Sequence, residues 1–194
     1  MKAWLIWGCA ALLGTSAHAL PSAWVSWVMD GDTVLLLPEG EREPVRARLQ
    51  GIDAPESCQA GGERSREALI ALVLRKTVQV QWHGQDSYGR HLARLWVAQT
   101  DVGAEMVRLG WAWAYSYRVG RGPYAALQRE AQGDKRGLFA ARETAMSPSV
   151  FRQFMAAAMP KPALRRRCSV CRRPGIPDRA ECGCPSRPVR GHRA

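Results

Sequence analysis

Five short segments in the first half of the chain are rich in apolar residues, and two of them, residues 45–49 and 77–83, alternate apolar with polar residues. Alternation at every second residue places one set of side chains on each face of an extended strand, so the pattern predicts β-strands. The five segments are residues 23–29, 33–37, 45–49, 77–83 and 91–97. Asp30-Gly31 stands between the first two, and this dipeptide is typical of a tight hairpin turn.

Three other segments have helical patterns, at residues 63–75, 101–109 and 123–135. The first has an apolar stripe at helical spacing. The second begins at Asp101, a suitable N-cap, and the third begins at Pro123, a residue favoured in the first turn. Strands followed by helices predict an α+β fold. We expect a five-stranded OB-type β-barrel with three packed helices.

The periodic pattern weakens after residue 145. Seven prolines between residues 148 and 188 argue against long regular structure there. Residues 146–194 contain 11 basic and 2 acidic residues, whereas residues 20–145 contain 16 and 15. We therefore predict a barrel domain at 20–145 and an irregular, partly disordered, basic Pro- and Cys-rich tail at 146–194. Attraction for polyanions should come mainly from the tail.

Residues 1–19 have the pattern of a secretory signal peptide. Lys2 precedes an apolar run from Ala3 to Leu13, and Ala17-His18-Ala19 fits a small-x-small cleavage site. No later run approaches the roughly 20 apolar residues of a membrane span. We expect a mature protein that is exported to the periplasm or the medium, has no stable membrane association and is a monomer.

Three motifs combine carboxylates with guanidinium groups. They are residues 30–33 (Asp-Gly-Asp-Thr), 48–56 (Arg-Leu-Gln-Gly-Ile-Asp-Ala-Pro-Glu) and 86–90 (Asp-Ser-Tyr-Gly-Arg). Carboxylates can bind a hard divalent cation or activate water, and arginines can bind phosphate oxygens with a bidentate fork. The chain has no P-loop, nucleophile elbow or dinucleotide fingerprint. The combination therefore indicates phosphodiester hydrolysis.

In the order and spacing of these motifs, residues 23–140 resemble the staphylococcal nuclease (thermonuclease) family. The resemblance implies a five-stranded OB barrel with three helices. It also implies an endonuclease that hydrolyses DNA and RNA with one Ca²⁺ ion and leaves 3′-phosphate ends. The alternative from a different class is a non-catalytic nucleic-acid-binding module of the same fold.

The resemblance assigns acidic residues to metal binding and to water activation. Asp32 and Asp53 match the metal-binding carboxylates of the family. Ala54 matches a residue that offers its backbone carbonyl to the metal, and Glu56 matches the residue usually assigned as general base. Glu56 follows Pro55, whose fixed backbone angle restricts the loop at that point.

The resemblance assigns basic and aromatic residues to the substrate. Arg48 and Arg90 match the two arginines that clamp the phosphate. Tyr88, Tyr115 and Tyr117 match aromatic residues that line the nucleotide pocket. The two arginines, together with Asp32, Asp53 and Glu56, favour an enzyme over a binding module.

Each residue also has a purely structural interpretation. An aspartate beside glycine is commonly a turn residue, and this explains Asp30 fully. Glu56 alone could be a solvated loop residue, and Tyr115 and Tyr117 could pack in the core. The combined motifs favour the functional interpretation for all of these except Asp30.

The cysteines of the tail leave two interpretations open. Cys168, Cys171, Cys182 and Cys184 could bind Zn²⁺, but the second pair is closely spaced and export favours disulfides. Cys58 follows the motif at 48–56, and a disulfide between Cys58 and the tail would hold the tail near that motif. The sequence does not determine the connectivity.

Overall fold

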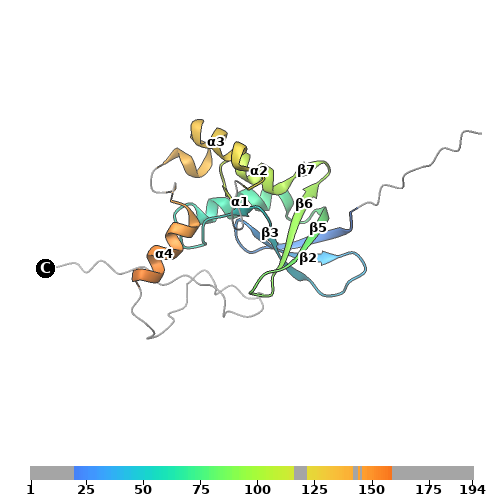
Figure 1. Cartoon of the computed structure of the whole chain (residues 1–194). Helices are drawn as coiled ribbons and strands as arrows, with labels where there is room; N and C mark the ends of the chain where they lie inside the picture. Colours follow the sequence, from blue (N-terminus) through green and yellow to red (C-terminus); the bar gives the residue numbers. More distant parts are fainter. Residues whose placement is uncertain (1–19, 116–121, 142–143, 145, 159–194) are drawn as a thin grey trace, which may run out of the picture.

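The computed structural model of the protein describes residues 20–115, 122–141, 144 and 146–158 (Figure 1). The predicted signal peptide and most of the predicted tail, including its four candidate zinc-binding cysteines, lie outside these ranges. Within the described ranges, no helix is both long and apolar enough to cross a membrane.

Five strands form a closed barrel, as the alternating pattern predicted. Antiparallel pairs join β1 to β2, β2 to β3, β1 to β5 and β5 to β6, and a parallel pair between β3 and β6 closes the ring. The strands of the barrel are β1 (Ser22–Val28), β2 (Thr33–Pro38), β3 (Val45–Leu49), β5 (Thr77–Gln85) and β6 (His91–Val97). The fold class expected from the sequence is therefore confirmed.

Alternate residues of these strands fill the interior of the barrel. Val25, Val34, Leu36, Val80 and Leu95 have no exposed surface, while the residues between them face outward or lie at the rim. Burial of an aliphatic side chain stabilises the fold by about 1.5–3 kcal/mol. The alternation of the sequence therefore corresponds directly to the inner and outer faces of the barrel.

Short elements extend the barrel at its edges. β4 (Ile52–Asp53) pairs with β8 (Trp113–Ala114), and β7 (Thr100–Asp101) pairs with the end of β6. The pairing of Asp53 with Trp113 holds the end of β4 in place. These elements position the 48–56 motif at one edge of the barrel.

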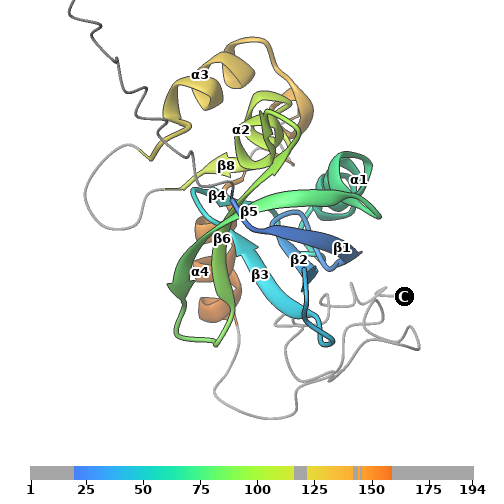
Figure 2. The same ribbon diagram turned by 90° about the vertical axis from the view of Figure 1, so that its right-hand side faces the viewer.

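Helices α1 to α3 pack together and against the barrel (Figure 2). They are α1 (Gly62–Val73), α2 (Val102–Arg108) and α3 (Ala125–Gly133), and a 3-10 helix, η1 (Gly137–Ala140), follows α3. The N-cap expected at Asp101 is present, because its side chain accepts a hydrogen bond from the backbone N–H of Ala104. The three helices predicted from the sequence are thus all observed.

A fourth helix, α4 (Pro148–Ala158), lies in the segment that the sequence analysis assigned to an irregular tail. It begins at a proline in the first turn, and the hydroxyl of Ser147 accepts a weak 3.4 Å hydrogen bond from the N–H of Val150. Figures 1 and 2 show α4 standing apart from the other three helices. The prolines further along the chain do not prevent one three-turn helix near the start of this segment.

Gly31 allows the Asp30–Asp32 turn to approach α1 closely. A Cβ atom at Gly31 would lie 2.0 Å from the Ser65 Oγ and 2.7 Å from the Ala54 Cβ. The Ser65 hydroxyl donates a 2.6 Å hydrogen bond to the Trp111 carbonyl, so it is not free to turn away. Glycine is therefore required at this position for packing.

We predict that Gly31→Ala destabilises the protein by about 1–3 kcal/mol, because the added methyl group overpacks a buried contact. The measurement is the free energy of unfolding in urea. Gly133→Ala is the matched control, since a Cβ atom there meets nothing within 4 Å. A stability loss of the same size in both variants would contradict the packing role of Gly31.

Candidate active site

Two buried carboxylates lie side by side at the edge of the barrel. Asp32 immediately precedes β2, and Asp53 is the last residue of β4. Each has only 3% of its surface exposed. Two negative charges at a buried position repel each other unless cations lie between them. The positive groups around the two aspartates therefore determine whether both carboxylates stay ionised.

Asp32 is fixed by several hydrogen bonds. Its Oδ1 accepts from the Thr33 hydroxyl at 2.9 Å, and its Oδ2 accepts from the backbone N–H of Ala54 at 2.9 Å. The Oδ1 of Asp30 accepts from the backbone N–H of Asp32 at 3.0 Å, which is the turn contact expected of Asp30. Burial, with the nearby Asp32 charge, raises the pKa of Asp30 well above its ordinary value.

Arg48 bridges the two aspartates. Its Nη1 lies 2.6 Å from the Asp32 Oδ1, and its Nη2 lies 2.8 Å from the Asp53 Oδ1. β3 pairs with β2 so that Arg48 stands opposite Thr33, and this register points the guanidinium at the pair. Burial would lower the pKa of Arg48, but the two carboxylates outweigh it and raise that pKa. The guanidinium thus holds both carboxylates within the span of one planar fork.

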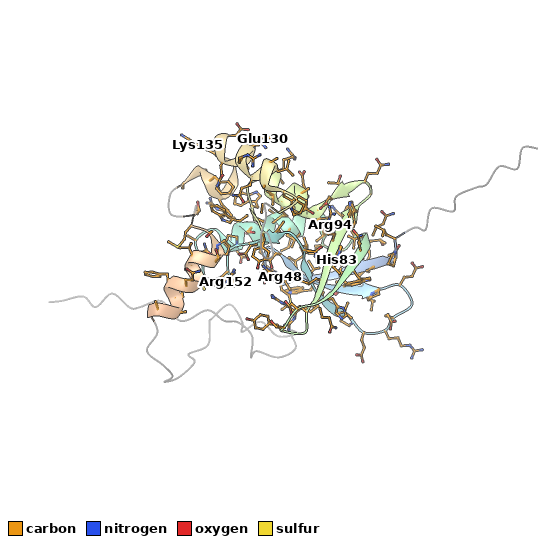
Figure 3. All side chains as sticks on the ribbon, viewed as in Figure 1. Arg48, His83, Arg94, Glu130, Lys135 and Arg152 are labelled. Carbon is orange, nitrogen blue, oxygen red and sulfur yellow. The ribbon has the colours of Figure 1, made fainter. Side chains whose placement is uncertain are left out.

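Glu56 joins the same cluster through a second arginine, Arg152 of α4 (Figure 3). The Arg152 Nη1 lies 2.8 Å from the Glu56 Oε1, and its Nη2 lies 2.8 Å from the Asp53 Oδ2. The same Nη1 also lies 3.3 Å from the Asp53 Oδ1. Burial would lower the pKa of Arg152, but hydrogen bonds to Asp53 and Glu56 raise it. Asp53 therefore contacts two guanidinium groups at once.

Gln59 also connects the Glu56 loop to the start of the α4 segment. Its backbone N–H donates to the Glu56 carbonyl at 2.8 Å, and its buried side-chain Nε2 donates to the Met146 carbonyl at 2.7 Å. Neighbouring Cys58 is disulfide-bonded. All other cysteines lie outside the described residues, so its pairing with the tail stays a prediction.

Arg90 and Tyr88 lie in the turn between β5 and β6 and contact each other there. The Arg90 Nε and Nη2 each lie 2.7 Å from the Asp86 Oδ2, and the Arg90 guanidinium stands 5.4 Å from the centre of the Tyr88 ring. Tyr88 is 74% exposed. The structure thus holds Arg90 on Asp86, whereas it holds Arg48 on the buried carboxylates.

The remaining predicted tyrosines follow β8. Tyr115 is 41% exposed, and its backbone N–H donates to the Gly51 carbonyl at 2.9 Å, so it lies beside the 48–56 motif. Tyr117 lies outside the described residues. The exposure of Tyr115 argues against the core-packing interpretation for this ring.

The chemistry of the donor set fits one hard divalent cation at the Asp32–Asp53 pair. Both side chains offer carboxylate oxygens, which Ca²⁺ and Mg²⁺ prefer, and the shared Arg48 fork brings one oxygen of each close together. Ala54 follows Asp53 directly and is buried, so its carbonyl is a candidate third ligand. In the described residues, no three acidic, histidine or cysteine side chains form a ready cation cluster. Guanidinium groups contact these oxygens instead.

Arg152 is the residue that sequence reasoning missed. The Ser147-Pro148 start and the apolar residues after it were a usable signal for the helix itself. The contact with Asp53 spans 99 residues of sequence, and no local pattern predicts such a separation. The docking of Arg152 was therefore visible only in three dimensions.

Known proteins resemble more than half of the chain. A family model described as "Staphylococcal nuclease homologue" matches residues 46–141. "Protein ParB" of Escherichia coli is 41% identical over 123 residues, which cover 58% of this chain and 68% of the relative. The "Micrococcal nuclease" of Shigella flexneri is 38% identical over 124 residues, covering 58% of this chain and 70% of the relative.

A third relative is an "Uncharacterized endonuclease" of Haemophilus influenzae. It is 38% identical over 113 residues, which cover 58% of this chain and 63% of the relative. The chain thus spans about two thirds of the length of these relatives. The family model ends at residue 141, before α4 begins.

We predict that Arg48→Met destabilises the protein by about 3 kcal/mol in the presence of a chelator, because two buried carboxylates lose their common cation. The measurement is urea unfolding at neutral pH. Arg108→Met is the control, since Arg108 forms a partly exposed pair with Glu105 within α2 and should cost under about 1 kcal/mol. Equal effects of the two substitutions would show that Arg48 does not hold the pair together.

Proposed function

The chain belongs to the staphylococcal nuclease family, and we propose that it is an exported endonuclease that cleaves DNA and RNA with Ca²⁺. Membership of the family makes it a phosphodiester-hydrolysing enzyme, as the motifs predicted. The family is metal-dependent. Our proposal adds four points to family membership. They are the choice of Ca²⁺, the action on both DNA and RNA, the 3′-phosphate products and the export.

The observation that supports the proposal is the cluster around Arg48. Arg48 contacts both Asp32, which precedes β2, and Asp53, at the end of β4. Arg152 in turn contacts both Asp53 and Glu56. Asp32, Asp53 and the Ala54 carbonyl would hold the cation, which when bound draws negative charge off a phosphate oxygen. Glu56 is 37% exposed at its side chain, so water can reach it. Its carboxylate can orient such a water and take its proton.

Arginines supply the phosphate contacts. The Arg48 fork is already aligned at the cluster and can transfer hydrogen bonds from carboxylate to phosphate oxygens. Arg90 reaches the phosphate only if it leaves Asp86 in the β5–β6 turn, where the two side chains are 23% and 16% exposed. Exposed Tyr88 and Tyr115 offer faces for bases to stack on, at about 1–3 kcal/mol per base and with little sequence preference. Stacking on the bases does not involve the sugar, so these contacts suit both DNA and RNA.

Export is supported by the sequence of residues 1–19 and by the disulfide at Cys58, which an oxidising compartment favours. The binding-module alternative is not favoured, because the chain retains all of the residues whose loss it would require. These are Asp32, Asp53, Glu56, Arg48 and Arg90.

We expect protein lacking residues 1–19 to degrade circular single-stranded DNA and RNA when Ca²⁺ is added, and to stop when the ion is chelated. A circle has no ends, so its cleavage identifies an endonuclease, and end-group analysis of the fragments tests for 3′-phosphates. Undiminished cleavage in excess chelator would remove the metal assignment.

A second prediction separates Glu56 from Asp32. Glu56→Gln should slow cleavage at least 100-fold while Ca²⁺ and nucleotide still bind, because the residue acts on water. Asp32→Asn should weaken Ca²⁺ binding itself, since it removes a ligand charge. Calorimetric titration with CaCl₂ and a nucleotide measures both, with circular dichroism as a control for folding. Equal loss of calcium affinity in the two variants contradicts this division of roles.

A further inference from the structure

Arg152 occupies the carboxylates that the proposed function assigns to the cation and to the base. Both oxygens of Asp53 accept hydrogen bonds from guanidinium groups, Oδ1 from Arg48 and Oδ2 from Arg152. Glu56 accepts from Arg152 through Oε1. In this arrangement the lone pairs that a cation would use on Asp53 already point at N–H groups.

A divalent cation and Arg152 cannot share this position. Two unit positive charges about 4 Å apart repel each other with roughly 4 kcal/mol at an effective dielectric constant of 20. The repulsion doubles when one of the two charges is divalent. Glu56 is also unavailable to a water molecule along the direction in which Arg152 donates to it. The contact therefore opposes both metal binding and water activation.

The attachment of Arg152 is weaker than that of Arg48. The Arg152 side chain is 45% exposed and Glu56 is 37% exposed, whereas Arg48 is 19% exposed between two buried aspartates. The Arg152–Glu56 pair is partly solvated on both sides and contributes up to about 1 kcal/mol, whereas the Arg152–Asp53 pair involves the same buried carboxylate that Arg48 contacts. Arg152 is thus the guanidinium that a competing cation would displace first.

The helix that bears Arg152 is attached to the rest of the protein along one face only. Val150 and Phe154 of α4 are 51% and 64% exposed, whereas Phe151 and Met155 are half-buried and Pro148 is buried. α4 stands apart from the other helices in Figures 1 and 2, and its Arg152 points toward Arg48 in Figure 3. The helix begins after residue 141, where the match to the family model ends.

We propose that α4 is an autoinhibitory element whose Arg152 competes with the divalent cation for Asp53 and blocks Glu56 until the cation binds. The proposal rests on the metal role of Asp53 in the proposed function. It predicts that cation binding and attachment of α4 exclude each other, which can be measured without following cleavage.

The test is a calorimetric titration of the protein with CaCl₂, compared with Arg152→Ala. We expect the substitution to tighten calcium binding by about tenfold, because the competing guanidinium is gone. Arg136→Ala is the matched control. It removes the same charge from ion pairs with Glu130 and Asp134, and Figure 3 places Glu130 well away from Arg152. It should leave calcium affinity unchanged.

Amide hydrogen exchange separates displacement from simple charge repulsion. Ca²⁺ should speed exchange in α4 of the unmodified protein at least tenfold, because the helix loses its attachment. In Arg152→Ala, exchange in α4 should be fast already and insensitive to Ca²⁺. Repulsion without displacement would leave exchange in α4 of the unmodified protein unchanged.

Three results would overturn the proposal. Equal calcium affinity in the two proteins would show that Arg152 does not compete, and the proposed function would stand. Slower exchange in α4 on adding Ca²⁺ would show that the helix belongs to the metal-loaded site. Absence of calcium binding in every variant would instead remove the metal assignment, on which both proposals depend.

Discussion

The bridge from Arg48 to Asp32 and Asp53 is the interaction on which the candidate active site depends. Two aspartates with 3% exposed surface would repel each other, and burial makes either charge costly without a partner. The guanidinium satisfies one oxygen of each at 2.6 and 2.8 Å. The residue before β2 and the ends of β3 and β4 must therefore meet at one point. The pairing of β2 with β3 places Arg48 opposite Thr33, next to Asp32, and the pairing of β4 with β8 holds Asp53.

The barrel could be predicted from the sequence because its signals are local. Alternation of Ala47 and Leu49 with arginines specifies which face of β3 is buried, and Asp30-Gly31 specifies the turn between β1 and β2. The motif residues were identifiable because their spacing resembles that of a known family. The sequence could also place Arg48 on a strand whose side chains alternate, which is the reason that it points at the site.

Contacts over long separations could not be predicted in this way. Helix α4 has a recognisable start at Ser147 and Pro148, yet its position depends on ion pairs and on a Gln59–Met146 hydrogen bond that have no periodic signature. The prolines farther along the segment outweighed that start signal. The contact of Arg90 could not be predicted either. A match to a family motif assigns Arg90 a role, but it does not show that the side chain forms an ion pair with Asp86.

Charge at this site follows from arrangement rather than composition. Residues 20–145 are nearly neutral overall, yet three carboxylates lie together at the site and would repel one another without cations. Arg48 of the barrel and Arg152 of α4 supply the positive charge between them. The same carboxylates that suit a cation therefore also attract the protein's own guanidinium groups. Arg48 lies on a strand of the barrel with its side chain 19% exposed, whereas Arg152 lies on α4 and is 45% exposed. Arg48 therefore stays close to the carboxylates even when its hydrogen bonds move to a phosphate, whereas Arg152 can leave together with its helix.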